Sequence, residues 1–307
     1  MSDKSKTVII IGGTGLLGRQ IVHKFQKLDY RVLVLTRNPL KAKKFFSTTV
    51  DFLYWDGEDM ESLKEVLNST KAVINLSGES IAKRWTQKNK ELILKSRVDT
   101  TNTVVQAINR CSAPPEVFIQ ASAIGFYSCN SSDPVDEDNS RGDGFLSKIV
   151  SQWEQASYSV DSKVRLVIIR TGVVLSSEGG FIKEILPAIK SFAGSWFGSG
   201  EQKVSWIHIQ DHANAVSFLL NNSNCKGVYN LVSSNPVVMK LLLKKIGKTI
   251  NRPVWLSIPS FFLQIIFGEM ANEVLLANQA VLPRRLIEAG FKFDFEDIDS
   301  ALKDLLI

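Results

Sequence analysis

The chain has 307 residues but only three cysteines, Cys111, Cys129 and Cys225, and they lie far apart in the sequence. This number and spacing exclude a disulfide framework, and without a C-x-x-C pair there is no zinc-binding pattern. We therefore expect a reducing compartment, the cytoplasm, and we predict no metal site.

Long hydrophobic runs are also absent. No apolar run approaches the roughly 18 residues that a membrane-spanning helix needs, so we predict no integral membrane segment. One short run, Phe261–Phe267, is strongly apolar. Such a run is typical of a buried helix, and peripheral contact with a membrane is the alternative.

The excess of positive charge is small, with a formal net charge of +6 that comes mainly from scattered lysines. This pattern favours an ordinary solvated surface and argues against a nucleic-acid partner. The hydrophobic content of 44% and the charged content of 22% are those of a globular protein. A chain of this length can bury a large core, and we expect one large α/β unit with a smaller lobe.

The clearest motif is rich in glycine and lies between the apolar run Val8–Ile11 and the amphipathic run Leu17–Leu28. It fits the dinucleotide fingerprint G-x-G-x-x-G and the related G-x-x-G-x-x-G. Its glycines allow a tight turn, close approach of backbone N–H groups to a pyrophosphate, and close packing of the helix on the strand. The helix N-terminus adds partial positive charge. The predicted nucleotide-binding residues are Gly12, Gly13, Thr14, Gly15, Leu16, Leu17 and Gly18.

The end of the second predicted strand, Arg31–Thr36, has no acidic residue. In NAD-binding sites an Asp or Glu near this point accepts a hydrogen bond from the ribose 2′-OH. No acidic residue occurs between Tyr30 and Val50. Arg37 stands there instead, with several lysines nearby, and a guanidinium suits a 2′-phosphate. The sequence therefore predicts NADP as the cofactor, bound in part by Arg37.

Strand and helix patterns alternate along most of the chain. This alternation predicts an α/β fold, a doubly wound parallel (Rossmann) sheet with its site at the carboxyl ends of the strands. At those ends we expect Asp56 to contact the adenine, and Asn75, Leu76, Ser77 and Gly78 to approach the cofactor. After the first two strands, the predicted strands are 52–55, 71–78, 117–123, 164–170, 204–209 and 228–231, and the predicted helices are 60–67, 86–110, 146–158, 179–190 and 211–220.

The chain is predicted to return to the sheet before it ends. We assign 1–175 and 206–231 to a dinucleotide-binding domain. The segments 176–205 and 232–307 form a smaller, interleaved and mainly helical C-terminal lobe. No repeat or low-complexity linker separates the two.

Short motifs run through the whole chain in a characteristic order. They are Gly12-Gly-Thr-Gly-Leu-Leu-Gly18, Asn75-Leu-Ser-Gly78-Glu-Ser-Ile81, Arg84-Trp-Thr86, Ser96-Arg97, Ser122-Ala-Ile-Gly-Phe-Tyr127, Trp153-Glu154, Arg170-Thr-Gly172, Trp206-Ile-His-Ile209 and Gly268-Glu-Met-Ala271 through Pro283 to Gly290-Phe291. In this order they resemble the extended short-chain dehydrogenase/reductase superfamily, which includes nucleotide-sugar epimerases and dehydratases. Within it they resemble an atypical subfamily of epimerase-family proteins, whose cyanobacterial and plastid members are often called SulA-like cell-division factors.

The resemblance implies a catalytic Tyr-x-x-x-Lys pair assisted by a serine, but the tyrosine is missing. Lys148 matches the lysine, which in active members holds the ribose and lowers the tyrosine pKa, and the residue four positions earlier is Gly144. Because general acid–base help is worth about 10²–10⁴-fold, a reaction at this site needs another proton donor. Tyr127, five residues after Ser122, is the candidate, and its alternative role is that of an aromatic residue that packs the loop over the cofactor. Ser122, Tyr127 and Lys148 are therefore the candidate catalytic residues, with a solvated position as the alternative for Lys148.

Other polar residues allow two interpretations. Glu79, Arg84 and Arg97 match the subfamily pattern, and they either bind an anionic substrate or tie their loop down internally. Arg97 is also assigned as a cofactor contact. His208 and His212 lie one helical turn apart, but no third ligand is evident, so we assign neither to a metal or to catalysis.

Two functions remain open. The first is an NADP-binding epimerase/dehydratase-like oxidoreductase acting on a small polar substrate. The second is a catalytically weak NADP-binding regulator or scaffold with a role in cell or plastid division. The missing tyrosine favours the second function, and the retained Ser122 and Tyr127 favour the first. The resemblance also implies a homodimer formed through the helices Thr86–Arg110 and Leu146–Tyr158.

Overall fold

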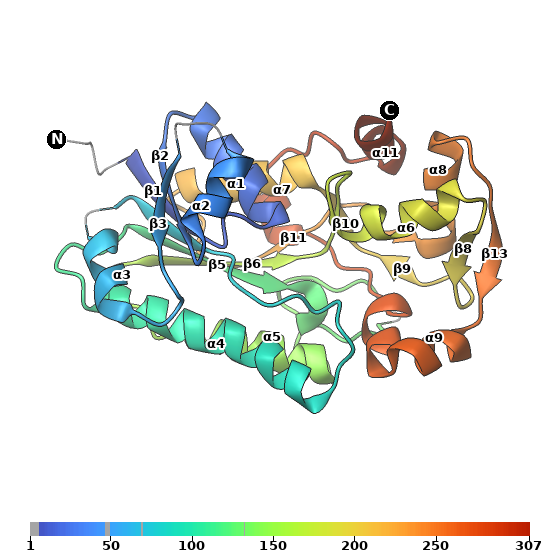
Figure 1. Ribbon diagram of the computed structural model, residues 1–307, viewed down its shortest axis with the longest axis horizontal. Helices are drawn as coiled ribbons and strands as arrows, with labels where there is room; N and C mark the ends of the chain where they lie inside the picture. The colour runs from blue at the N-terminus through green and yellow to red at the C-terminus, as the bar shows by residue number, and fades with distance from the viewer. Residues whose placement is uncertain (1–5, 47–49, 69, 132) are drawn as a thin grey trace.

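A seven-stranded parallel sheet forms the centre of the computed structural model, which describes residues 6–46, 50–68, 70–131 and 133–307 (Figure 1). The strand order is β3-β2-β1-β4-β5-β6-β11, and all neighbouring strands are parallel. The order reverses beside β1, which confirms the predicted doubly wound Rossmann fold. The strands are β1 (Thr7–Ile11), β2 (Arg31–Thr36), β3 (Asp51–Tyr54), β4 (Ala72–Asn75), β5 (Val117–Ala123), β6 (Arg165–Thr171) and β11 (Gly227–Leu231).

Helices cover both faces of this sheet, which explains why consecutive residues of β1, Val8 to Ile11, are all apolar and all buried. Along β1, Val8 and Ile10 pack in the core with α1 and α7, whereas Ile9 and Ile11 pack in the core with α3 and α4. In Figure 1, α1 and α7 lie above the sheet, whereas α3, α4 and α5 lie below it. The helices are α1 (Leu16–Lys27), α3 (Met60–Leu67), α4 (Gln87–Asn109), α5 (Phe145–Ser157) and α7 (Ile209–Asn221), with a short α2 (Pro39–Ala42) after β2.

A smaller lobe with a mainly helical C-terminal part lies beyond the carboxyl ends of the strands, at the right of Figure 1. Its core gathers Ile182, Trp206, Leu242 and Leu302 with their neighbours. Its helices are α6 (Gly180–Lys190), α8 (Met239–Thr249), α9 (Ser260–Phe267) and α11 (Ile298–Leu306). Short strands pair as β7 (Val173–Leu175) with β10 (Trp206–His208), β9 (Lys203–Val204) with β12 (Val237–Val238), and β8 (Gly194–Phe197) with β13 (Val254–Ile258).

The late part of the chain contacts both lobes. Between the two passages through the smaller lobe, the chain returns to the sheet through α7 and β11. Near the end of the chain, Leu286 of α10 (Arg284–Glu288) and Phe291 pack in the core of the sheet. The segment 232–307, expected to lie in the smaller lobe, therefore contributes side chains to both cores.

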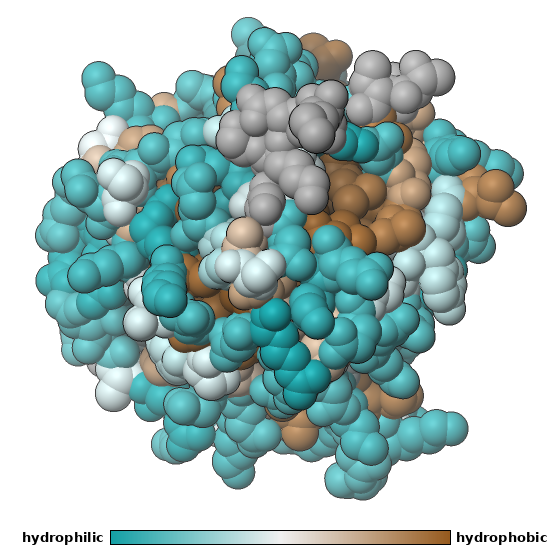
Figure 2. Space-filling model, turned by 90° about the vertical axis from the view of Figure 1, so that its left-hand side faces the viewer, coloured by the Kyte–Doolittle hydropathy of each residue, from teal (hydrophilic) through white to brown (hydrophobic). Residues whose placement is uncertain are grey.

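The expectation that Phe261–Phe267 is a buried helix is wrong for most of its side chains. Phe261, Phe262, Ile265 and Ile266 of α9 are between 50% and 69% exposed, and Leu263 is buried. The opposite end of the molecule, which faces the viewer in Figure 2, is mainly hydrophilic. Among the described residues, no helix combines the length and the apolar character needed to cross a bilayer.

Candidate functional site

The glycine turn between β1 and α1 has the geometry that a dinucleotide fingerprint requires. Gly12 has a φ of +78°, and a Cβ there would come within 3.0 Å of the Leu76 carbonyl. A Cβ on Gly18 would lie 2.4 Å from the Gly12 carbonyl oxygen, so the helix packs on the turn only because no side chain intervenes. No side chain caps the N-terminus of α1, and its first turn contains no acidic residue. The turn therefore fits a pyrophosphate held by backbone N–H groups.

The loop after β4 is organised by Asn75. This side chain is fully buried, donates to Thr101 and Gln120 at 3.3 and 3.0 Å, and accepts from the backbone N–H and the hydroxyl of Ser77. Asn75 therefore shapes the loop from inside. Leu76, which follows it, brings its backbone against the Gly12 turn.

Arg97 ties this loop down from α4. Its guanidinium donates to the carbonyl oxygens of Glu79 and Ile93 at 3.0 and 3.1 Å, and its Cζ lies 5.1 Å from the Trp153 ring centroid. A Cβ on Gly78 would lie 3.1 Å from the same Cζ, so a side chain there would push the guanidinium outward. Burial lowers the pKa of Arg97 to about 10. Of the two interpretations of Arg97, the structure shows the internal tie. Its role as a cofactor contact stays a prediction.

Arg37 and Asp56 lie where the sequence placed them, beyond the ends of β2 and β3. The Arg37 side chain is 77% exposed, and its Nη2 lies 3.8 Å from the Glu79 carboxylate. Asp56 accepts from the backbone N–H groups of Glu58 and Asp59 at 2.8 and 3.0 Å, and these bonds lower its pKa. Both side chains are thus available at the edge of the sheet that carries the glycine turn.

Two of the three candidate catalytic residues belong to one buried polar network. Ser122 donates to Glu154 at 2.5 Å, and Arg170 donates to both Glu154 carboxylate oxygens at 2.8 Å. Arg170 also donates to the Tyr127 hydroxyl, which donates to Asn230, both at 2.9 Å. Every member of this network is buried, with a relative exposure of 4% or less. An ion pair with so many satisfied partners holds β5, α5, β6 and β11 in one arrangement.

This network occupies the hydroxyl groups of Ser122 and Tyr127. Burial raises the pKa of Tyr127, which further opposes ionisation of its hydroxyl. The Lys148 side chain is exposed on α5 and forms no hydrogen bond with either hydroxyl. The structure therefore brings Ser122 and Tyr127 together but does not join Lys148 to them.

At the position of the missing tyrosine, Gly144 faces a carboxylate from the far end of the chain. Glu273 accepts from the backbone N–H groups of Phe145 and Leu146 at 2.9 and 2.8 Å and thereby caps α5. Gly144 has a φ of +100°, and a Cβ there would lie 2.9 Å from the same carboxylate. Sequence reasoning missed Glu273, because 128 residues separate it from the helix that it caps.

The two histidines have separate partners. His208 lies 3.2 Å from Asp304 and stacks on Phe295, whereas His212 lies 3.1 Å from the Thr171 hydroxyl. In the described part of the chain, no cluster of three or more His, Cys, Asp or Glu side chains is arranged to hold a metal.

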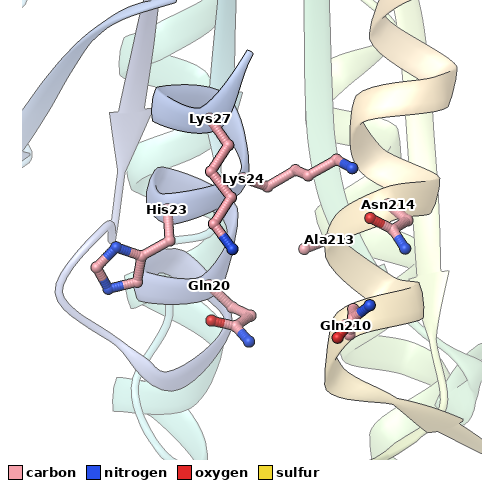
Figure 3. A pocket seen from close by; sticks show the side chains of 7 residues that line it. All are labelled: Gln20, His23, Lys24, Lys27, Gln210, Ala213 and Asn214. Carbon is pink, nitrogen blue, oxygen red and sulfur yellow. The ribbon is translucent and has the colours of Figure 1, made fainter. Parts of the chain in front are cut away.

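A cavity of about 150 Å³ opens between α1 and α7 (Figure 3). Its lining comes from the later turns of α1 and from α7, so it is distinct from the glycine turn at the start of α1. The lining side chains are polar apart from one alanine, and they are Gln20, His23, Lys24, Lys27, Gln210, Ala213 and Asn214.

Comparison with known proteins agrees with this geometry over nearly the whole chain. Residues 8–231 match the NAD dependent epimerase/dehydratase family, and residues 258–305 match a domain of unknown function, DUF1731. The chain is 34% identical to the chloroplastic epimerase family protein SDR39U1 homolog of Arabidopsis thaliana, covering 99% of this chain and 88% of that protein. It is also 34% identical to the epimerase family protein YfhF of Bacillus subtilis, covering 97% of both.

A solved structure is similar throughout. The human epimerase family protein SDR39U1 (isoform 2), crystallised with NADPH, superposes with a TM-score of 0.88 at 28% identity over 97% of this chain and 98% of that one. The fold, the glycine turn and the matched residues together lead to one conclusion. This chain belongs to the NAD dependent epimerase/dehydratase family, the extended short-chain dehydrogenases/reductases.

Proposed function

We propose that this protein is an NADP(H)-binding, epimerase/dehydratase-like oxidoreductase that acts on a small polar substrate. The observation that carries the proposal is Arg37, a largely exposed guanidinium beside the glycine turn, in a stretch with no acidic residue between Tyr30 and Val50. The human relative crystallised with NADPH supports this choice of cofactor.

Each part of the nucleotide would be bound by a different group of residues. The N–H groups of Thr14 to Leu17 would hold the pyrophosphate, Arg37 the 2′-phosphate, Asp56 the adenine, and the loop from Leu76 to Gly78 the ribose. When bound, the nicotinamide supplies a hydride donor or acceptor.

On the substrate side, we propose positioning roles for Ser122 and Tyr127. Their hydroxyls are hydrogen-bonded to Glu154, Arg170 and Asn230. They therefore hold the backbone at the end of β5 in place and do not exchange protons with the substrate. Lys148 is the exposed member of the three and the candidate for contact with ribose or substrate.

A second candidate function is a regulator or scaffold that binds NADP(H) and turns over little substrate, with a role in cell or plastid division. Gly144 favours it, because the position of the usual proton-transferring tyrosine has no side chain. A screen of small carbonyl and alcohol substrates with NADP(H) separates the two candidates. Turnover supports the enzyme, and binding without turnover supports the regulator.

We also propose a homodimer through the outer surfaces of α4 and α5. Leu92 of α4 and Tyr158 at the end of α5 are 46% and 50% exposed. Light scattering on the purified protein should give twice the mass of the 34.2 kDa chain.

The cofactor proposal is tested by thermal unfolding with added nucleotides. A ligand at 100 times its Kd raises the free energy of unfolding by about 2.7 kcal/mol, so NADPH should stabilise the protein more than NADH at equal concentration. Arg37→Ala should remove this difference, since a hydrogen bond to a charged group is worth about 1.5–3 kcal/mol. Equal stabilisation of the native protein by both nucleotides would contradict the proposal.

A further inference from the structure

The fold supplies a carboxylate to the nucleotide site from a strand other than β2. Because β2 and β4 both flank β1, the residues that follow them lie at the same edge of the sheet, beside the glycine turn. Arg37 follows β2 and Glu79 follows β4, and their charged groups are 3.8 Å apart. The stretch after β2 therefore lacks an acidic residue in the sequence but has one beside it in space.

Glu79 is held in this position by its own backbone. Its N–H donates to the Ser96 hydroxyl at 3.0 Å, and its carbonyl accepts from Arg97 at 3.0 Å. Its side chain is 35% exposed, whereas that of Arg37 is 77% exposed. The carboxylate thus projects from a fixed loop, and its second partner is Lys83 at 3.2 Å.

The two charges have opposite preferences for the adenosine ribose. A carboxylate accepts hydrogen bonds from ribose hydroxyls, and a guanidinium binds a 2′-phosphate. Within a few ångströms, the same carboxylate repels a doubly charged phosphate and also competes for the guanidinium.

We infer that Glu79 is the specificity-determining partner of Arg37 and that the site binds both NAD(H) and NADP(H). The inference rests on the proposed nucleotide site. At this site, Glu79 accepts hydrogen bonds from the ribose hydroxyls of NAD(H). It thereby reduces the difference in affinity by which Arg37 favours NADP(H) over NAD(H).

The test is calorimetric titration of the full-length protein with NADPH and with NADH. Glu79→Gln keeps the shape of the side chain and removes its charge, so the ratio of the NADH Kd to the NADPH Kd should rise about tenfold. Both dissociation constants should contribute to this change in the ratio, because the variant should bind NADPH more tightly and NADH more weakly than the native protein does. Glu61→Gln, on the exposed surface of α3, is the matched control and should leave the ratio unchanged.

The outcomes separate this inference from the proposed function. If Arg37→Ala removes the preference for NADPH while Glu79→Gln leaves the ratio unchanged, the inference fails and the proposed cofactor stands. If Arg37→Ala leaves the preference intact, the 2′-phosphate is held elsewhere and the cofactor proposal itself fails.

A purely structural role of Glu79 is also distinguishable. Its loop is held by backbone bonds to Ser96 and Arg97, so the Tm of Glu79→Gln without nucleotide should stay within about 2 °C of the native value. Glu79→Ala, which removes the acceptor entirely, should raise the ratio at least as far as Glu79→Gln. A lower Tm with an unchanged ratio in both variants would overturn the inference.

Discussion

At the scale of single residues, buried hydrogen-bond partners decide what a side chain can do. Tyr127 follows β5 at a plausible position for a proton donor, but its partner Asn230 is 103 residues away in the sequence. Sequence spacing gives a residue's position along an element and not the direction of its side chain. The same limit applies to Ser122, whose hydroxyl turns toward Glu154 on α5.

Tyr127→Phe should lower the free energy of unfolding by about 1–3 kcal/mol. Removal of the hydroxyl leaves an Arg170 N–H and the Asn230 amide oxygen without this partner in the interior. Urea denaturation measures the change, and Tyr54→Phe, at a side chain that is 59% exposed, should change little. Unchanged stability together with complete loss of turnover would instead make Tyr127 a proton donor.

His212 gives a pH-dependent term to the stability of the fold. Complete burial lowers its pKa to about 4, from an ordinary value near 6.5. The unfolded chain therefore takes up a proton first as the pH falls, so stability present above pH 6.5 is lost progressively toward pH 4.

The loss should reach about 2–3 kcal/mol at pH 4.5. It is measured as the difference between the native protein and His212→Gln in urea denaturation from pH 7 to 4.5. The variant should lose less stability than the native protein over this range. If the free energy of unfolding of the two proteins falls in parallel over this pH range, His212 is not the source of the pH dependence.

At the scale of elements, most helices and strands were predictable because their patterns are local. The predicted helices 86–110 and 146–158 match α4 and α5 within one residue at each end, and the predicted strand 164–170 matches β6 as closely. The predicted strand 204–209 is two short strands, β9 and β10, that pair with different neighbours. Pairing partners depend on tertiary structure, which hydrophobic periodicity does not report.

Glu273→Ala should loosen the first turn of α5. The change removes the acceptor of two backbone N–H groups, and loss of an N-terminal cap costs about 0.5–2 kcal/mol. Hydrogen exchange of the Phe145 and Leu146 amides should accelerate several-fold. Glu269→Ala is the matched control, because it breaks the ion pair between Lys90 and the same segment without touching these amides. Equal acceleration in both variants would contradict a specific capping role.

At the scale of the whole molecule, the sheet and its glycine turn were readable from sequence, and the contacts between distant segments were not. The run Val8–Ile11 forms β1, and the glycines after it allow the tight turn into α1 through local sterics. Glu79 near Arg37 and Glu273 at Gly144 arise only when segments meet in three dimensions. The apolar run of α9 shows the same limit. Its sequence predicts a helix but not which of its side chains other segments cover, and most of them are exposed.

The most direct measurement is a crystal structure of the protein with NADP⁺. The pyrophosphate should lie against the N-terminal N–H groups of α1, and the 2′-phosphate should lie within hydrogen-bonding distance, about 3 Å, of the Arg37 guanidinium. A nucleotide bound there with its 2′-phosphate away from Arg37, or bound between α1 and α7, would contradict the assignment.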